Sequence, residues 1–124
     1  MKNFLLLLTF FFAISLSGFN AQTKNITIAE SATELAKSKK NGNYHFTLHS
    51  QVTQADVEKS AAYYPAFFTV DYDASSHIAS VKMIDNNEKS RLVLLRFLSS
   101  IRSQKIQVDG KNMLIHEFYD LYLK

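Results

Sequence analysis

The sequence predicts an α+β fold in which strand, helix, strand, strand, helix and strand follow one another. Three observations predict it. Apolar and polar residues alternate in residues 44–48 and 67–72, as in half-buried strands. Apolar residues recur at helical spacing in residues 88–103. The length of 124 residues suits one domain.

The first mature element is expected to be a helical linker over residues 22–42, with its helix at residues 26–41. Two capping-box patterns begin at Thr27 and Ser31, each with a glutamate three residues later. Asn41 and Gly42 form a good helix stop. The apolar side of this helix is thin, so we expect it to be loosely attached to the domain that follows.

Residues 43–124 are expected to form that domain. After the strand at residues 44–48, Thr53 caps a helix that Pro65 ends. The strand at residues 67–72 leads through a polar turn into a strand that carries Ala79, Val81 and Met83 on its inner side. The helix at residues 88–103 precedes a short strand at 105–108, a turn at Asp109-Gly110 and a C-terminal helix at 117–123.

This order is that of a ferredoxin-like βαββαβ sandwich. Right-handed crossovers place both helices on one sheet face and leave the other open. Mostly polar side chains are expected on the open face, namely His45, Thr47, His49, Thr69, Asp71, Ser80, Lys82 and Gln107. The exceptions are Phe67, Ile78 and Ile84, which the C-terminal helix or a partner could cover.

Residues 1–21 are typical of a bacterial signal peptide. Lys2 precedes an apolar run over residues 4–16, which is short for a membrane span. Cleavage is expected after Ala21, with Ser17 as the alternative site. The sequence therefore predicts an extracytoplasmic protein, periplasmic or secreted, with no stable membrane insertion after cleavage. An uncleaved anchor is the alternative.

The composition and the absence of known motifs exclude several classes of function. There are no cysteines, which excludes disulfides and an acylated N-terminal cysteine. The formal net charge of +3 is too small to indicate nucleic-acid binding. There is no Gly-x-Ser-x-Gly motif and no glycine-rich phosphate loop. We therefore expect a non-enzymatic domain without a cofactor.

The element order, Val52-Thr53 before the first helix and the strand at residues 68–72 resemble the heavy-metal-associated domains of copper chaperones. The resemblance covers about residues 44–108 and implies the ferredoxin-like fold. In that family, two cysteines at the first loop bind the metal. Gln54 and Val57 stand at those positions here and cannot supply thiolates to Cu(I). The resemblance thus implies the fold without the thiolate metal site.

Two sets of residues are candidate sites. His49 ends the first strand and His77 begins the third, so both lie at one sheet edge, where they are candidate metal ligands. Exposed edge histidines without a metal are the alternative. The aromatic residues Phe118, Tyr119 and Tyr122 of the C-terminal helix are candidates for contact with a protein or peptide partner, and packing on the protein's own sheet is the alternative. The predicted function is an exported binding domain, with a His/Met metal-binding protein as the second hypothesis and a homodimer left open.

Overall fold

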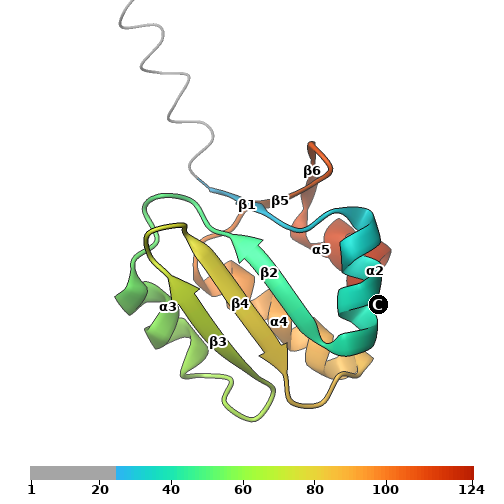
Figure 1. Ribbon diagram of the computed structural model, residues 1–124, viewed down its shortest axis with the longest axis horizontal. Helices are drawn as coiled ribbons and strands as arrows, with labels where there is room; N and C mark the ends of the chain where they lie inside the picture. The colour runs from blue at the N-terminus through green and yellow to red at the C-terminus, as the bar shows by residue number, and fades with distance from the viewer. Residues whose placement is uncertain (1–24) are drawn as a thin grey trace, which may run out of the picture.

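The computed structural model describes residues 25–124, in which a mixed sheet packs against helices (Figure 1). The described part of the chain has six strands in the order β3-β4-β2-β1-β5-β6. They are β1 (Ile26–Ile28), β2 (Asn43–Thr47), β3 (Phe68–Asp73), β4 (Ile78–Met83), β5 (Lys105–Val108) and β6 (Lys111–Leu114). The helices are α2 (Ala32–Asn41), α3 (Gln54–Ala61), α4 (Glu88–Ser100), α5 (Ile115–Phe118) and the π-helical η2 (Tyr119–Leu123). The fold is α+β, as predicted. The signal peptide predicted for residues 1–21 lies outside the described residues.

The first strand corrects the prediction of a helix beginning at residue 26. β1 pairs antiparallel with β2 through Ile28 and Thr47, and parallel with β5 through three residue pairs. The β-branched residues of β1 favour an extended conformation. Thr27, at the centre of the strand, is fully buried. The Thr27 hydroxyl forms a hydrogen bond with the hydroxyl of Ser103. β1 therefore lies between β2 and β5, which the predicted four-strand order would have made neighbours.

α2 begins at Ala32 rather than at residue 26. The side chain of Ser31 accepts a hydrogen bond from the Glu34 amide and caps the helix. Gly42 ends it with a φ of 78°, a left-handed conformation that favours glycine. Leu35 is fully buried in the common core. The described part of the predicted linker thus belongs to the same sheet and core as residues 43–124.

The two crossover helices follow the predicted caps. Thr53 and Asp56 form a capping box at the start of α3, and the Asn87 side chain accepts from the Ser90 amide at the start of α4. α4 is shorter than predicted because Ile101 caps it and Arg102 adopts a left-handed φ of 66°. Figure 1 shows α4 passing behind the central strands. The sheet and the helices enclose a core rich in aromatic rings, with Tyr44, Phe46, Phe68, Phe97 and Phe118 among its largest fully buried side chains.

The C-terminal part turns back along the sheet. Asp109 and Gly110 both have positive φ and form the predicted turn, which here connects β5 to the additional strand β6. α5 and η2 then return to the core, where Phe118 and Leu123 are fully buried. Among residues 25–124, no helix has the length and apolar character needed to cross a membrane.

Candidate functional site

The outer edge of β3 offers main-chain groups that pair with no other strand among residues 25–124. β3 pairs with β4 in continuous register from Phe68–Met83 to Asp73–Ile78, and no described strand lies on its other side. The Ile84 amide donates to the Phe67 carbonyl, so these two residues form a hydrogen-bonded pair at the start of the ladder between β3 and β4. Hydrogen-bonded and non-hydrogen-bonded pairs alternate in antiparallel sheets, so Val70 and Tyr72 direct their amides and carbonyls away from β4.

The outer edge of β3 lacks several of the features that prevent edge strands from pairing with other chains. β3 is six residues long and contains no proline, lysine or bulge. β6, at the opposite edge of the described sheet, is shorter and begins with Lys111. The two edges therefore differ, and β3 is the better template for an added strand.

The open face beside this edge carries two carboxylates on β3 and one cation, Lys82, on β4. Thr69, Asp71 and Asp73 alternate with the inward residues of β3 and are exposed. On β4, Ser80 lies opposite Asp71 and Ile78 lies opposite Asp73, so neither carboxylate faces a cation across the strand pair. Hydrogen bonds from the Ser75 hydroxyl and amide to Asp73 lower the pKa of its carboxyl. An adjacent strand with basic side chains would complement this face.

Two isoleucines interrupt the polar open face at one end. Ile28 and Ile78 both lie opposite Thr47 on the flanking strands, and they are 46% and 36% exposed. Ile84, just after β4, is also exposed. The C-terminal segment does not cover these side chains, because α5 and η2 pack with α2, α4 and β5.

His77, one of the two predicted metal ligands, is held by Tyr72. Its Nδ1 lies 3.2 Å from the Tyr72 hydroxyl, which donates its hydrogen bond to the Val52 carbonyl at 3.0 Å. Since a phenol has one proton, Nδ1 of His77 must be the donor in their contact. The backbone of His77 has a φ of 61°, which fits its place in the turn before β4. The Tyr72 hydroxyl thus links His77, in the turn before β4, to Val52 in the loop between β2 and α3.

His49, the other predicted ligand, lies elsewhere than predicted. β2 ends at Thr47, and the chain then turns so that the Val52 amide donates to the His49 carbonyl. The alternation of the strand has lapsed at this point, and His49 lines a cavity between α3 and the end of α4 instead of the open face. Both ring nitrogens are buried and have no hydrogen-bond partner among the described residues.

Burial lowers the pKa of the His49 imidazole, and the positive charge of Arg102 acts in the same direction. The Ile101 carbonyl and the Asp56 carboxylate oppose the shift. The Ile101 carbonyl lies near the His49 ring, but its geometry is not that of a hydrogen bond, and neither ring nitrogen has a hydrogen-bond partner among the described residues.

The cavity beside His49 has a volume of about 250 Å³. Its polar lining comes from Asp56, Lys59, Ser60, Tyr63 and Arg102. The Thr53 amide donates a hydrogen bond to the Asp56 carboxylate, and the Asp56 amide donates to the Thr53 hydroxyl. The amide of Thr53 and then its hydroxyl lower the pKa of the Asp56 carboxyl, which stays engaged in the helix cap.

The structure does not bring the two histidines into a metal centre. His77 does not line the cavity that His49 lines. Among residues 25–124 there is no group of three or more histidine, aspartate or glutamate side chains placed to hold one ion.

The predicted partner-binding residues of the C-terminus face inward to different degrees. Phe118 is fully buried, with its ring 6.3 Å from that of Phe46 and 5.7 Å from that of Tyr122. It therefore cannot contact a partner, which corrects the prediction for this residue. Tyr119 and Tyr122 are half-buried against the core, and the Tyr119 hydroxyl donates to Glu88 at 3.3 Å. The exposed apolar residue of this segment is Leu121.

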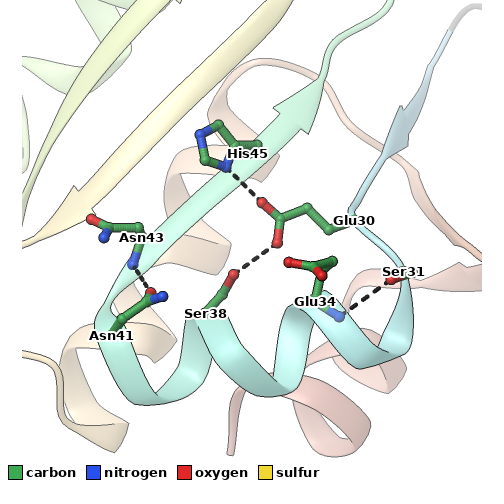
Figure 2. Close-up of polar contacts among 7 residues, drawn as sticks. All are labelled: Glu30, Ser31, Glu34, Ser38, Asn41, Asn43 and His45. Carbon is green, nitrogen blue, oxygen red and sulfur yellow. Dashed lines mark hydrogen bonds and ion pairs between the residues drawn. The ribbon is translucent and has the colours of Figure 1, made fainter.

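A polar bridge that the sequence did not predict joins β2 to α2 (Figure 2). One carboxylate oxygen of Glu30 lies 2.6 Å from Nδ1 of His45, and the other accepts from the Ser38 hydroxyl at 2.7 Å. Because β1 contacts β2 only near Thr47, the first half of β2 has α2 beside it in place of a strand. The Glu30 bridge closes this gap on the open face.

Comparison of the chain with protein-family models, with curated proteins and with solved structures found no match.

Proposed function

We propose that this chain is an exported, non-enzymatic domain that binds an extended polypeptide along the outer edge of β3. The observation that carries the proposal is the unpaired edge of this strand, where Val70 and Tyr72 present main-chain donors and acceptors. Strand addition at such an edge is a common way to bind peptides, because the main-chain hydrogen bonds supply affinity for any sequence.

The side chains beside the edge indicate which polypeptide fits. Asp71 and Asp73 project to the open face without an ion-pair partner among the described residues. Opposite charges on neighbouring strands stabilise a sheet, whereas like charges destabilise it. We therefore propose a partner segment in which basic residues alternate with apolar ones.

The experiment uses two synthetic peptides about as long as β3, one alternating lysine with valine and one alternating glutamate with valine. The chain beginning at Gln22 is titrated with each peptide, and its amide NMR signals and hydrogen exchange are followed. We expect the lysine peptide to protect the Val70 and Tyr72 amides and the glutamate peptide to bind at least about tenfold more weakly. Unchanged β3 amides at saturating lysine peptide would refute the proposal.

A pair of variants separates main-chain binding from side-chain binding. Val70→Pro removes an amide that points away from β4, a position that tolerates proline in an edge strand. Val70→Ala shortens the same side chain but keeps the amide. We expect the proline variant to lose about tenfold in peptide affinity relative to the alanine variant. Equal affinities would show that the peptide does not pair with this edge.

Export is part of the same proposal. Its support is the sequence of residues 1–21, with Lys2 ahead of the apolar run. The mass and N-terminal sequence of the protein recovered from the cell envelope or the medium provide the test. We expect a chain that begins at Gln22, and recovery of the intact chain from the cytoplasm alone would contradict export.

We also propose that the sheet is a ferredoxin-like unit enlarged by β1 and β6. When these two strands are left out, the remaining order is β3-β4-β2-β5, which is the order of that fold. The resemblance to heavy-metal-associated domains concerns the same part of the chain. Val57, at one of the cysteine positions, is buried, which fits a core residue better than a ligand. Titration with Cu(II) and Zn(II) distinguishes the metal-binding hypothesis, since binding that shifts the His49 or His77 signals would favour it over the peptide-binding proposal.

A further inference from the structure

The outward side of α4 carries a short apolar stripe. The stripe consists of Leu92, which is 41% exposed, and Leu95, which is half-buried. The exposed Ser99 follows on the same side one turn later. These residues lie at helical spacing on the side opposite the buried Val93, Leu94, Phe97 and Leu98. Because Leu92 is on the exposed side of α4, it does not contribute to the packing of this helix on the sheet.

The stripe forms one wall of a groove with a volume of about 800 Å³. We call it the α4 groove. Leu114, Ile115 and His116, where β6 joins α5, form its other wall, and Tyr64 also lines it. Leu114 is 45% exposed, so apolar surface faces solvent on both sides. The groove thus has exposed apolar side chains on both of its walls.

Two exposed side chains of opposite charge flank Leu92 at equal spacing, and a third charge, Lys89, lies three residues before Leu92. Glu88 lies four residues before it and Arg96 four residues after it, and both are exposed. With a rise of about 1.5 Å per residue, each charge lies about 6 Å along the helix from Leu92. Neither belongs to one of the two ion pairs found within residues 25–124. Glu88 accepts a hydrogen bond from the neutral Tyr119 hydroxyl and lies in the first turn of α4, where the helix dipole favours a negative charge.

This arrangement suits an isologous contact, in which residue i of one copy meets residue j of the other and residue j meets residue i. Two antiparallel copies of α4 that cross at Leu92 place Glu88 of each copy beside Arg96 of the other. The leucines meet at the centre, and the two ion pairs lie at the rim. A parallel arrangement would instead place like charges together.

We propose that the α4 groove is a self-association surface, through which two copies of this chain form an antiparallel dimer centred on Leu92. The second copy is favoured over an unrelated partner because a single stripe supplies both members of each ion pair. The proposal does not rest on peptide binding at β3, and either can fail without the other.

The experiment measures the molecular mass of the chain beginning at Gln22 by sedimentation over a dilution series. We expect a reversible monomer–dimer equilibrium. Leu92→Lys buries a charge at the centre of the contact and is expected to raise the dissociation constant at least about tenfold. Lys82→Glu changes a charge on the open face and serves as the control, with an unchanged constant. A wild-type protein that stays monomeric up to its solubility limit would refute the proposal.

Charge exchange tests the antiparallel geometry itself. Glu88→Arg gives each copy two cations on the stripe, and Arg96→Glu gives each copy two anions, so each variant alone is expected to dimerise at least about tenfold more weakly. Mixed together, the two variants restore both ion pairs and are expected to form a one-to-one heterodimer. If the mixture associates no better than the separate variants, the proposed geometry is wrong. This comparison does not depend on whether Leu92→Lys folds.

Discussion

Nε of Arg91 donates a hydrogen bond to the Leu123 carbonyl at 2.5 Å, which fixes the last helical turn of the chain against α4. Nη1 of the same guanidinium donates to the Asn86 side chain at 3.0 Å. Asn86 in turn donates to the Lys39 carbonyl at the end of α2. A buried arginine therefore ties the C-terminus, the β4–α4 loop and α2 together.

Arg91→Met should lower the free energy of unfolding by about 2–4 kcal/mol, because the buried Leu123 carbonyl loses its charged hydrogen-bond partner and the half-buried contact with the Asn86 side chain is lost as well. Chemical denaturation measures the change. Lys89→Met, at an exposed position of the same helix, is the control and should change stability by less than about 0.5 kcal/mol. An equal effect of the two substitutions would show that the buried hydrogen bonds contribute little.

Tyr44→Phe should stabilise the protein by about 1 kcal/mol at neutral pH, because the Tyr44 hydroxyl is buried without a hydrogen-bond partner among the described residues. Burial raises the pKa of this phenol to about 12, while the nearby Arg91 charge opposes the shift. The folded state thus favours the neutral form, and this contribution to stability is lost as the pH rises from about 10 towards 12.

Denaturation from neutral to alkaline pH measures both effects. The wild-type protein should lose stability over this window, and the Tyr44→Phe variant should lose less. Tyr63→Phe, at a side chain that is 72% exposed, is the matched control and should behave as wild type. A destabilised Tyr44→Phe variant would mean that the hydroxyl has a partner that the contacts do not reveal.

His49→Gln should weaken the acid sensitivity of the fold. Burial lowers the pKa of His49 in the folded state, so protons bind the unfolded chain more readily. The wild-type protein is expected to lose stability as the pH falls below about 6.5, the usual pKa of histidine, and the variant should lose less. Urea denaturation at several pH values provides the measurement, with His116→Gln as the control. Identical pH profiles for all three proteins would contradict this prediction.

Gly42→Ala should cost more stability than Gly110→Ala. Both glycines have a φ of 78°, so each substitution places alanine in the left-handed region, at a cost of about 1 kcal/mol. A Cβ at residue 42 would also approach Cβ of Met83 to 3.2 Å, whereas nothing lies within 4 Å at residue 110. The difference between the two variants in thermal unfolding therefore measures the packing of α2 against β4. Equal costs would show that Met83 moves away freely.

The strands and helices that the sequence predicted best have long, local signals. β3 and β4 alternate over six residues each, and α4 repeats its apolar positions over more than three turns. β1 has no such signal. Its three residues overlap a capping pattern, and its place in the sheet depends on Ser103, which is 76 residues away in the sequence. Intrinsic propensity cannot predict a pairing of that range.

The candidate sites show the same limit. His49 was placed on the open face by extending the alternation of β2, but the strand ends two residues earlier. Phe118 belongs to an amphipathic segment, and the pattern alone cannot distinguish a face that packs on the protein's own core from one that meets a partner. The outward parity of Thr69, Asp71 and Ser80, by contrast, follows directly from alternation and was predicted.

The position of β1 has a consequence for the order of events in folding. This strand is synthesised before the other described strands, yet its parallel partner β5 follows β2, β3 and β4 in the chain. Contacts of such long range cost loop-closure entropy before they are formed, and they slow folding. The middle of the sheet therefore stays incomplete until β5 has been synthesised, although most of the other strands are already present in the chain by then.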